Sequence, residues 1–285
     1  MNTDDDFVRR FLFDDLDIRG ALVRLGTAWQ SLLSNRNYAP AVARLLGETT
    51  AVAALIGANL KQAGRLTLQV QGHGPVRLLV VDCNSSLGLR GMAMAGPQIN
   101  EAPLAELLGD GQLVLTLDME MGRQPYQSIV PLQGDTVAAV FEHYLAQSEQ
   151  QPTRLWLAAN ADYAVGLFLQ QLPGAGHKDA DGWNRVQHLA ATVTPGELAG
   201  LTPEDLLTRL FPDETLRLFE AVPATHDCPE DWGKAENLLR SLGREEVESI
   251  LSEHGEVVLK DDLGNHSYRF DADAINRIFD TPTLH

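Results

Sequence analysis

The sequence predicts an α+β protein with three successive parts. Apolar residues recur at helical spacing in some segments and alternate with a period of two in others, so helices and strands are both expected. At 285 residues, the chain is long enough for one large domain and a smaller one. We expect a mixed helix and sheet domain at 1–174, a helical linker region at 175–225 and a small α+β module at 226–285.

The first domain should open with two helices that face its core. Over 16–33 and again over 41–60, apolar residues have the spacing of one helical face. These residues are Leu22, Leu25, Trp29 and Leu32 in the first segment and Val42, Leu45, Leu46, Val52 and Leu55 in the second.

The apolar period then changes to two, which indicates strands. Leu66, Leu68 and Val70 alternate with polar residues, the stretch GHGP at 72–75 turns the chain, and an alternating segment at 76–80 returns it as a hairpin. We expect the glycines of this turn to need positive φ angles. Further strands are expected at 87–94, 113–117 and 127–132, a helix from Asp135, and a closing hairpin at 153–159 and 164–172.

The expected linker region starts with a Gly-rich polar stretch at 174–182 and then becomes helical. Two sites carry the signature of a helix start, with Thr at the N-cap, Pro at the first helical position and an acid at the third. They are Thr194 to Glu197 and Thr202 to Asp205. The apolar stripe that follows is more typical of a core than of a binding surface. It consists of Leu206, Leu207, Leu210, Phe211 and Leu218.

The last part reads as a compact module. Two short helices are expected on either side of Gly243, followed by strands at 256–259 and 267–270. The sequence DDLGN at 261–265 lies between these strands and has the composition of a tight turn. A final helix is expected at 271–280.

Composition excludes several classes of function. The net charge is −17 with no Lys/Arg-rich stripe, so neither nucleic acid nor an anionic membrane is an expected partner. The acidic start differs from a secretory signal and no apolar run would span a bilayer, so we expect a cytoplasmic protein. Cys83 and Cys228 are the only cysteines, which leaves at most one disulfide.

Catalytic signatures are missing from the sequence. It contains no phosphate loop, no HExxH and no GxSxG, and the stretch at 71–76 lacks the third glycine of a dinucleotide fingerprint. The histidines, such as His73 and His143, lack metal spacing on one helical face, so structural or surface roles are expected. Cys83 ends an apolar strand and should be a small buried side chain. We predict that the protein is not an enzyme.

Four stretches together resemble one known family, the 33-kDa chaperonins, which are redox-regulated heat-shock holdases of bacteria. They lie at 70–96, 107–117, 126–159 and 242–257, beginning VQGHGPV, LLGDGQL, YQSIVPL and LGREEVE. The similarity covers essentially the whole chain. It implies an α+β N-terminal domain, a helical linker folded over it and a C-terminal module.

In that family, the C-terminal module binds zinc through four cysteines, arranged as C-x-C and then C-x-x-C. The resemblance places Cys228, Glu230, Asp261 and Gly264 at these positions, so one thiol of four remains. Structural zinc needs a closed tetrahedral set of ligands, and we therefore predict no metal and no cofactor. A substitute set stays open as the alternative, namely His226, Cys228, Asp261 and His266. Without zinc, Gly264 and Asn265 would hold the hairpin by adopting left-handed angles.

The resemblance implies an ATP-independent chaperone that binds unfolded or partly unfolded client proteins through apolar surface. Because the family's switch uses thiols that are absent here, we expect a holdase without redox control. Its client surface would be the face of the N-terminal sheet together with the linker helices. A regulatory protein that binds one specific folded partner is the alternative, an enzyme with an unrecognised acid pair is a second rival, and a homodimer stays open.

Overall fold

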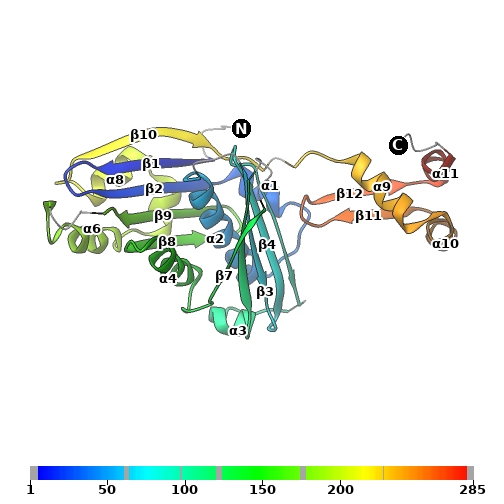
Figure 1. Ribbon diagram of the computed structural model, residues 1–285, viewed down its shortest axis with the longest axis horizontal. Coiled ribbons are helices and arrows are strands. Elements are labelled where there is room, and N and C mark those ends of the chain that lie inside the picture. The colour runs from blue at the N-terminus through cyan, green and yellow to red at the C-terminus, as the bar shows by residue number, and fades with distance from the viewer. Residues whose placement is uncertain are drawn as a thin grey trace. The chain divides into compact units, whose positions relative to one another are not determined.

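The computed structural model describes residues 6–60, 64–96, 98–119, 124–173, 178–226 and 228–280. The chain divides into two compact units, residues 1–227 and residues 228–285. Figure 1 shows the first as a layered assembly of strands and helices and the second as a small group of helices around a hairpin. Each unit has its own hydrophobic core. The predicted α+β class is confirmed.

The N-terminal unit contains two antiparallel five-stranded sheets. The first sheet has the order β10 (Leu216–Pro223), β1 (Phe7–Phe13), β2 (Ile18–Leu25), β9 (Ala164–Gln171) and β8 (Thr153–Ala159). The second has the order β5 (Leu89–Ala95), β4 (Val76–Asn84), β3 (Gly64–Gln71), β6 (Gln112–Met119) and β7 (Tyr126–Val130). Strands distant in sequence therefore pair within each sheet, most notably β1 with β10.

A buried helix forms the centre of this unit. In α2 (Pro40–Gly57), 15 of 18 residues are buried, and most of the apolar ones share one core with residues of both sheets. Gly47 lies where α2 packs closely against Ala159 of the first sheet, because a Cβ at position 47 would lie 2.5 Å from the Cβ of Ala159. The other helices before the linker are α1 (Thr27–Leu33), α3 (Leu104–Leu108) and α4 (Val137–Glu149).

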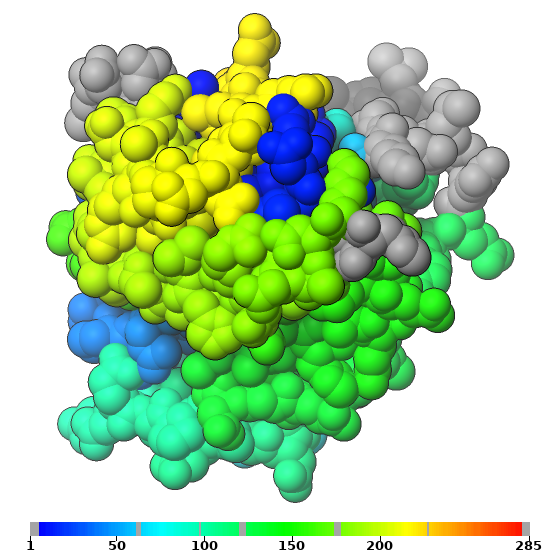
Figure 2. Space-filling model, turned by 90° about the vertical axis from the view of Figure 1, so that its left-hand side faces the viewer, coloured from blue at the N-terminus to red at the C-terminus, as the bar shows by residue number. Residues whose placement is uncertain are grey.

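A second core lies on the first sheet, beneath α6 (Gly182–Ala190), α7 (Pro195–Gly200) and α8 (Pro203–Leu210). Figure 2 shows these yellow-green helices and the yellow β10 segment spread over one face, with dark-blue residues from the start of the described chain beside them. The predicted caps are present: the side chain of Thr194 accepts from Glu197 N, and that of Thr202 accepts from Asp205 N. The stripe expected to be core is buried, apart from Leu218, which is partly buried.

The C-terminal unit has a small core. Its elements are α9 (Trp232–Leu242), α10 (Arg244–His254), β11 (Val257–Asp261), β12 (His266–Phe270) and α11 (Ala272–Asp280). The two strands form a hairpin, and the helices pack around it. The buried residues of this core are Ala235, Leu239, Val247, Val257, Tyr268, Phe270, Ile275 and Ile278.

Three sequence predictions about the N-terminal unit were wrong. The segment 16–33 is not one helix, because β2 occupies its first half and α1 its second. Strand β2 is buried on both faces, which makes its apolar run continuous and hides the period of two. The linker is not wholly helical, because β10 lies within it. Finally, Gly72 and Gly74 do not have positive φ angles.

Close packing explains the glycines of that turn. A Cβ on Gly72 would lie 2.2 Å from the carbonyl oxygen of Val76, and one on Gly74 would lie 2.6 Å from that of Leu107. The Gly-rich stretch expected at the start of the linker lies partly outside the described residues, at 174–177. In the part of the chain that is described, no helix is long and apolar enough to cross a membrane.

Candidate functional site

Three of the four positions that the resemblance assigned to zinc ligands lie together in the C-terminal unit. A Cβ added to Gly264 would lie 2.7 Å from Cys228 Sγ and 2.5 Å from Asp261 Oδ2. The carboxylate of Asp261 also accepts a hydrogen bond from Gly264 N at 3.0 Å. The hairpin thus brings Asp261 and Gly264 against Cys228. The side chains of Cys228 and Asp261 occupy the space that a side chain at position 264 would need.

The remaining candidate ligands have other hydrogen-bond partners. Glu230 accepts a hydrogen bond from Trp232 Nε1 at 2.8 Å. The ring of His266 is hydrogen-bonded through Nε2 to the backbone oxygen of Cys228. His226 belongs to the N-terminal unit, where its Nδ1 is 2.9 Å from the carbonyl oxygen of Leu89. His226 thus belongs to a different unit from the other three members of the substitute set, Cys228, Asp261 and His266.

Zinc does not fit these residues. Tetrahedral zinc sites in proteins use four ligands drawn mainly from Cys and His, whereas this position offers one thiol, one carboxylate and a glycine. Among residues 6–280 that are described, no group of three or more His, Cys, Asp or Glu side chains is arranged to hold a metal ion. We therefore assign no metal-dependent step to this unit.

The turn of the hairpin uses its two small residues differently from the prediction. Asn265 does adopt a left-handed angle, with φ of 61°. Gly264 does not, and it is needed because its neighbours leave no room for a side chain. Sequence reasoning identified the turn but attributed the glycine to backbone freedom, because the approach of Cys228 comes from a residue 36 positions earlier.

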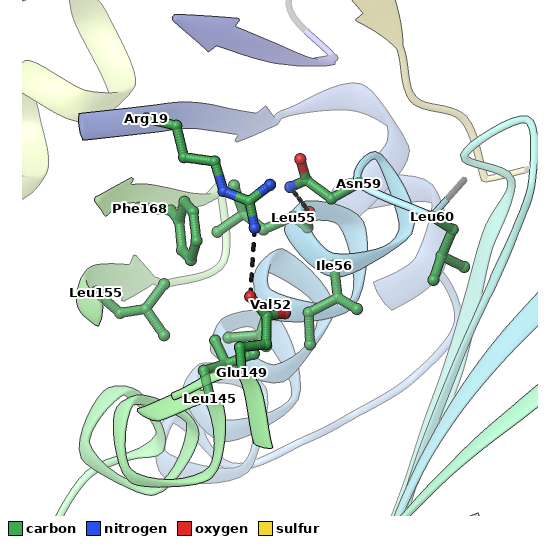
Figure 3. A pocket seen from close by; sticks show the side chains of 10 residues that line it. All are labelled: Arg19, Val52, Leu55, Ile56, Asn59, Leu60, Leu145, Glu149, Leu155 and Phe168. Carbon is green, nitrogen blue, oxygen red and sulfur yellow. Dashed lines mark hydrogen bonds and ion pairs between the residues drawn. The ribbon is translucent and has the colours of Figure 1, made fainter. Parts of the chain in front are cut away.

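An apolar cavity of about 290 Å³ opens in the N-terminal unit between α2, α4 and the first sheet. Figure 3 shows Arg19 of β2 reaching over it toward Glu149 at the end of α4. The lining consists of Arg19, Val52, Leu55, Ile56, Asn59, Leu60, Leu145, Glu149, Leu155 and Phe168. Five elements contribute to it, which is why sequence reasoning singled out only Val52 and Leu55, and those as core residues.

The polar groups of this cavity are paired with one another. The guanidinium of Arg19 donates to Gln170 Oε1 at 2.8 Å and lies 3.3 Å from Glu149 Oε2. The same Glu149 oxygen accepts from Gln170 Nε2 at 2.8 Å, and Asn59 donates to the backbone of Leu55. Acid–base catalysis needs a titratable group directed at a substrate, so this arrangement suits an apolar group better than a reaction.

The two thiols differ in environment. Cys83 is fully buried at the end of β4, and desolvation, together with the charge of Asp82, raises the pKa of its thiol to about 12. The prediction of a buried structural cysteine is confirmed. Cys228 is half-buried, and neither cysteine is in a disulfide. Because the thiolate is the reactive form, burial and the raised pKa both disfavour reaction at Cys83 at neutral pH.

Comparison with known proteins identifies the class. A family model described as Hsp33 protein matches residues 6–271. The 33 kDa chaperonin of Chromobacterium violaceum is 43% identical over 277 residues, covering 96% of this chain and 94% of that protein. The 33 kDa chaperonin of Azotobacter vinelandii is 43% identical over 284 residues, covering 97% and 95%.

The fold agrees with this similarity. The crystal structure of the 33 kDa chaperonin (heat shock protein 33 homolog) of Thermotoga maritima covers 97% of this chain, and 98% of that chain is covered in return. Its TM-score is 0.82 at 22% sequence identity. The chain described here belongs to the Hsp33 family, and the resemblance expected from the sequence is confirmed.

Proposed function

We propose that this chain is an ATP-independent holdase in which heat, and not thiol oxidation, uncovers the surface that binds unfolded clients. One observation carries the second half of this proposal. Only Cys228 is a thiol among the four positions, and Gly264 and Asp261 occupy the space around it. A switch made of two disulfides needs four thiols, so opening must depend on the folding stability of the C-terminal unit.

The apolar surface of the first sheet supports a gated mechanism. The phenylalanines of β1 are buried against the linker helices, in one cluster with Leu206, Leu210 and Phe211. A client could reach these side chains only after part of the linker moves. The strongly acidic composition would keep a loaded complex in solution, because like charges repel one another.

The test compares the full chain with a chain truncated after Asp227. The division between the two units lies there, and a cut near Glu220 would destroy β10. We expect the truncated chain to suppress aggregation of a thermally unfolding client at lower temperature than the full chain. Both should act without ATP and without turnover of any substrate, as a protein that is not an enzyme must.

Two results would contradict the proposal. Equal activity of both chains at every temperature would show that the C-terminal unit does not gate the surface. A stable complex with one folded partner, together with indifference to unfolding clients, would favour the regulatory interpretation instead. Location in the cytoplasm, exclusion of nucleic acid and a homodimer remain predictions from the sequence.

A further inference from the structure

Strand β10 occupies the outer edge of β1 through an interrupted ladder. Its pairs with β1 form two short runs, Phe7–Arg9 with Ala221–Pro223 and Phe11–Phe13 with Leu216–Leu218, and the register shifts between them. The last residue of the strand is Pro223, which has no N–H to donate. A β-bulge of this kind leaves residues unpaired and disrupts the ladder locally.

Few side chains of β10 are buried against the rest of the N-terminal unit. From 212 to 226, Ala224 is the one buried residue, while Leu216 and Leu218 are partly buried. Arg9 Nε donates to the backbone oxygen of Phe219 at 2.9 Å, and Arg217 lies 3.0 Å from Asp14. Exposed ion pairs of this kind contribute little to stability.

The chain beyond β10 is held by backbone bonds and then enters the other unit. Ala224 N donates to the oxygen of Asp6, Thr225 N to that of Leu87, and Leu89 N donates to Thr225. The C-terminal unit begins at Cys228, a few residues further on. β10 is therefore the last regular element before that unit and the most weakly packed strand of its sheet.

The edge beneath β10 is a strong template for pairing. β1 has the sequence FVRRFLF, rich in aromatic and β-branched residues, and its three phenylalanines are buried in the second core. β2 already pairs with its other side along all seven residues. Once β10 leaves, a row of backbone donors and acceptors beside an apolar cluster becomes available, which is the arrangement that recruits an extended chain.

We propose that the β1 edge, uncovered when β10 detaches, binds an extended segment of an unfolding client by β-strand addition. The inference rests on the proposed holdase function and names its binding site. β10 shows what fits: an extended segment of about six to eight residues with apolar side chains at alternate positions, as Leu216 and Leu218 are in this strand. Arg10 lies over the ring of Phe219 at 6.0 Å, so an aromatic residue is favoured opposite it.

The test uses a disulfide that holds β10 in place. Leu12 and Arg217 are directly opposite in the ladder, at a spacing that a disulfide can span. The double variant L12C/R217C is made with Cys228→Ser, so that the one natural cysteine left beside the two new thiols is Cys83, which is buried. The control T116C/Q127C joins β6 to β7 in the second sheet, where Thr116 and Gln127 are opposite.

We expect oxidised L12C/R217C to lose client holding, because the crosslink lowers the released fraction of β10 by roughly a hundredfold. Reduction should restore it, and the control should hold clients in both redox states. In the complex of the Cys228→Ser chain with a client, hydrogen exchange should show the amides of β1 protected and those of β10 exposed.

Each other outcome would overturn the inference. If oxidised L12C/R217C held clients as well as its reduced form, β10 would not need to detach from β1 for client binding. Exposed β1 amides in the client complex would show that clients bind elsewhere, even if β10 must move. If the β1 amides were already protected from exchange in a dimer without client, and adding client changed nothing, the β1 edge would bind a second copy of this chain and not a client. A Cys228→Ser chain that holds no client at all would instead reject the proposed function itself.

Discussion

The two units of this chain are stabilised in different ways. In the N-terminal unit, a helix with 15 buried residues lies between two five-stranded sheets, and a second core covers the first sheet. In the C-terminal unit, α9, α10 and α11 bury one or two residues each, and the core contains eight buried residues. A unit of this size has little surface to bury, so its folding free energy is small.

Aromatic packing contributes to the stability of the C-terminal unit. Trp232 makes edge contacts with Tyr268 and Phe270, at ring-centre distances of 5.0 and 5.7 Å. The hydroxyl of Tyr268 accepts a hydrogen bond from Asp231 N at 2.8 Å, which ties α9 to β12. The contacts that hold this hairpin to α9 are thus aromatic packing and one hydrogen bond, whereas the N-terminal unit is held by two larger cores.

Placing cysteines at the three family positions that lack them should stabilise the C-terminal unit and bring its folding free energy closer to that of the N-terminal unit. The variant E230C/D261C/G264C supplies four cysteines and deletes the Asp261 carboxylate that crowds Gly264. We expect it to bind one zinc ion per chain and to stabilise the C-terminal unit by several kcal/mol, since structural zinc contributes on the order of 10 kcal/mol in small modules. Metal analysis and hydrogen exchange of 228–280, with and without chelator, would measure this.

The same triple variant with Cys228→Ser lacks the fourth thiol and should bind zinc poorly. The natural chain should retain no stoichiometric zinc after dialysis against a weak chelator. One zinc per natural chain would contradict our reading of the site and would revive the mixed-ligand alternative.

Removing one core side chain should widen the difference between the units. Leu239 of α9 is fully buried, so Leu239→Ala is expected to cost about 2–5 kcal/mol, which is comparable to the whole stability of a small unit. Its neighbour Leu238 is 50% exposed, and Leu238→Ala should change stability by about 0.5 kcal/mol or less. Hydrogen exchange of 228–280 would measure both.

On the proposed gating, Leu239→Ala should also lower the temperature at which clients are held, and Leu238→Ala should not. Loss of the C-terminal fold without any change in that temperature would separate the stability of this unit from control of activity.

The pH should change the stability of the N-terminal unit. Glu48 of α2 is buried, and desolvation raises its pKa to about 7, opposed by the nearby Arg44 guanidinium. In the folded state, the Glu48 carboxyl therefore stays protonated above pH 4.5, whereas in the unfolded state it releases its proton near that pH. The free energy of unfolding should fall by about 3 kcal/mol between pH 4.5 and pH 7 and stay lower above it.

Glu48→Gln should abolish that decline and make the unit more stable than the natural chain at pH 8, with little difference at pH 4. Glu106→Gln, at an exposed position of α3, is the matched control and should keep the decline. Denaturant unfolding across this pH range measures the effect. A natural chain whose N-terminal stability is flat from pH 4.5 to pH 8 would refute the assignment to Glu48.

Sequence reasoning succeeded where neighbouring residues determine the structure. The hairpin of β3 and β4, helix α2 and the capped helices at Thr194 and Thr202 all follow from local periodicity or local hydrogen bonds. It failed for β10, which is mostly exposed and is a strand because it pairs with β1, some 200 residues earlier. The alternation of Leu216 and Leu218 is too short to indicate a strand by itself, because the partner that makes this segment a strand is distant in the sequence.

The candidate site shows the same limit. The resemblance located Cys228, Asp261 and Gly264, but the requirement for a glycine came from contact between residues far apart in the chain. The cavity beside Arg19 and Glu149 is assembled from five elements and carried no sequence signal.

The smallest expected effect is that of oxidation on client holding. Each unit contains one cysteine, and the two cysteines lie in different environments. Cys83 of the N-terminal unit is buried with its pKa raised to about 12, so peroxide should leave it unmodified. Cys228 of the C-terminal unit is half-buried and has no second cysteine within its unit. Peroxide can therefore form at Cys228 a sulfenic acid, a mixed disulfide or a bridge between two chains, and none of these closes a loop within the unit.

We expect peroxide to shift the temperature at which clients are held by little or nothing, and Cys228→Ser to behave like the natural chain. Aggregation assays on both proteins, reduced and oxidised, measure this. A large peroxide activation that Cys228→Ser abolishes would point to a disulfide-linked dimer. One that persists in Cys228→Ser would mean that redox control acts through groups other than the half-buried thiol, and the separation of heat from oxidation proposed here would fail.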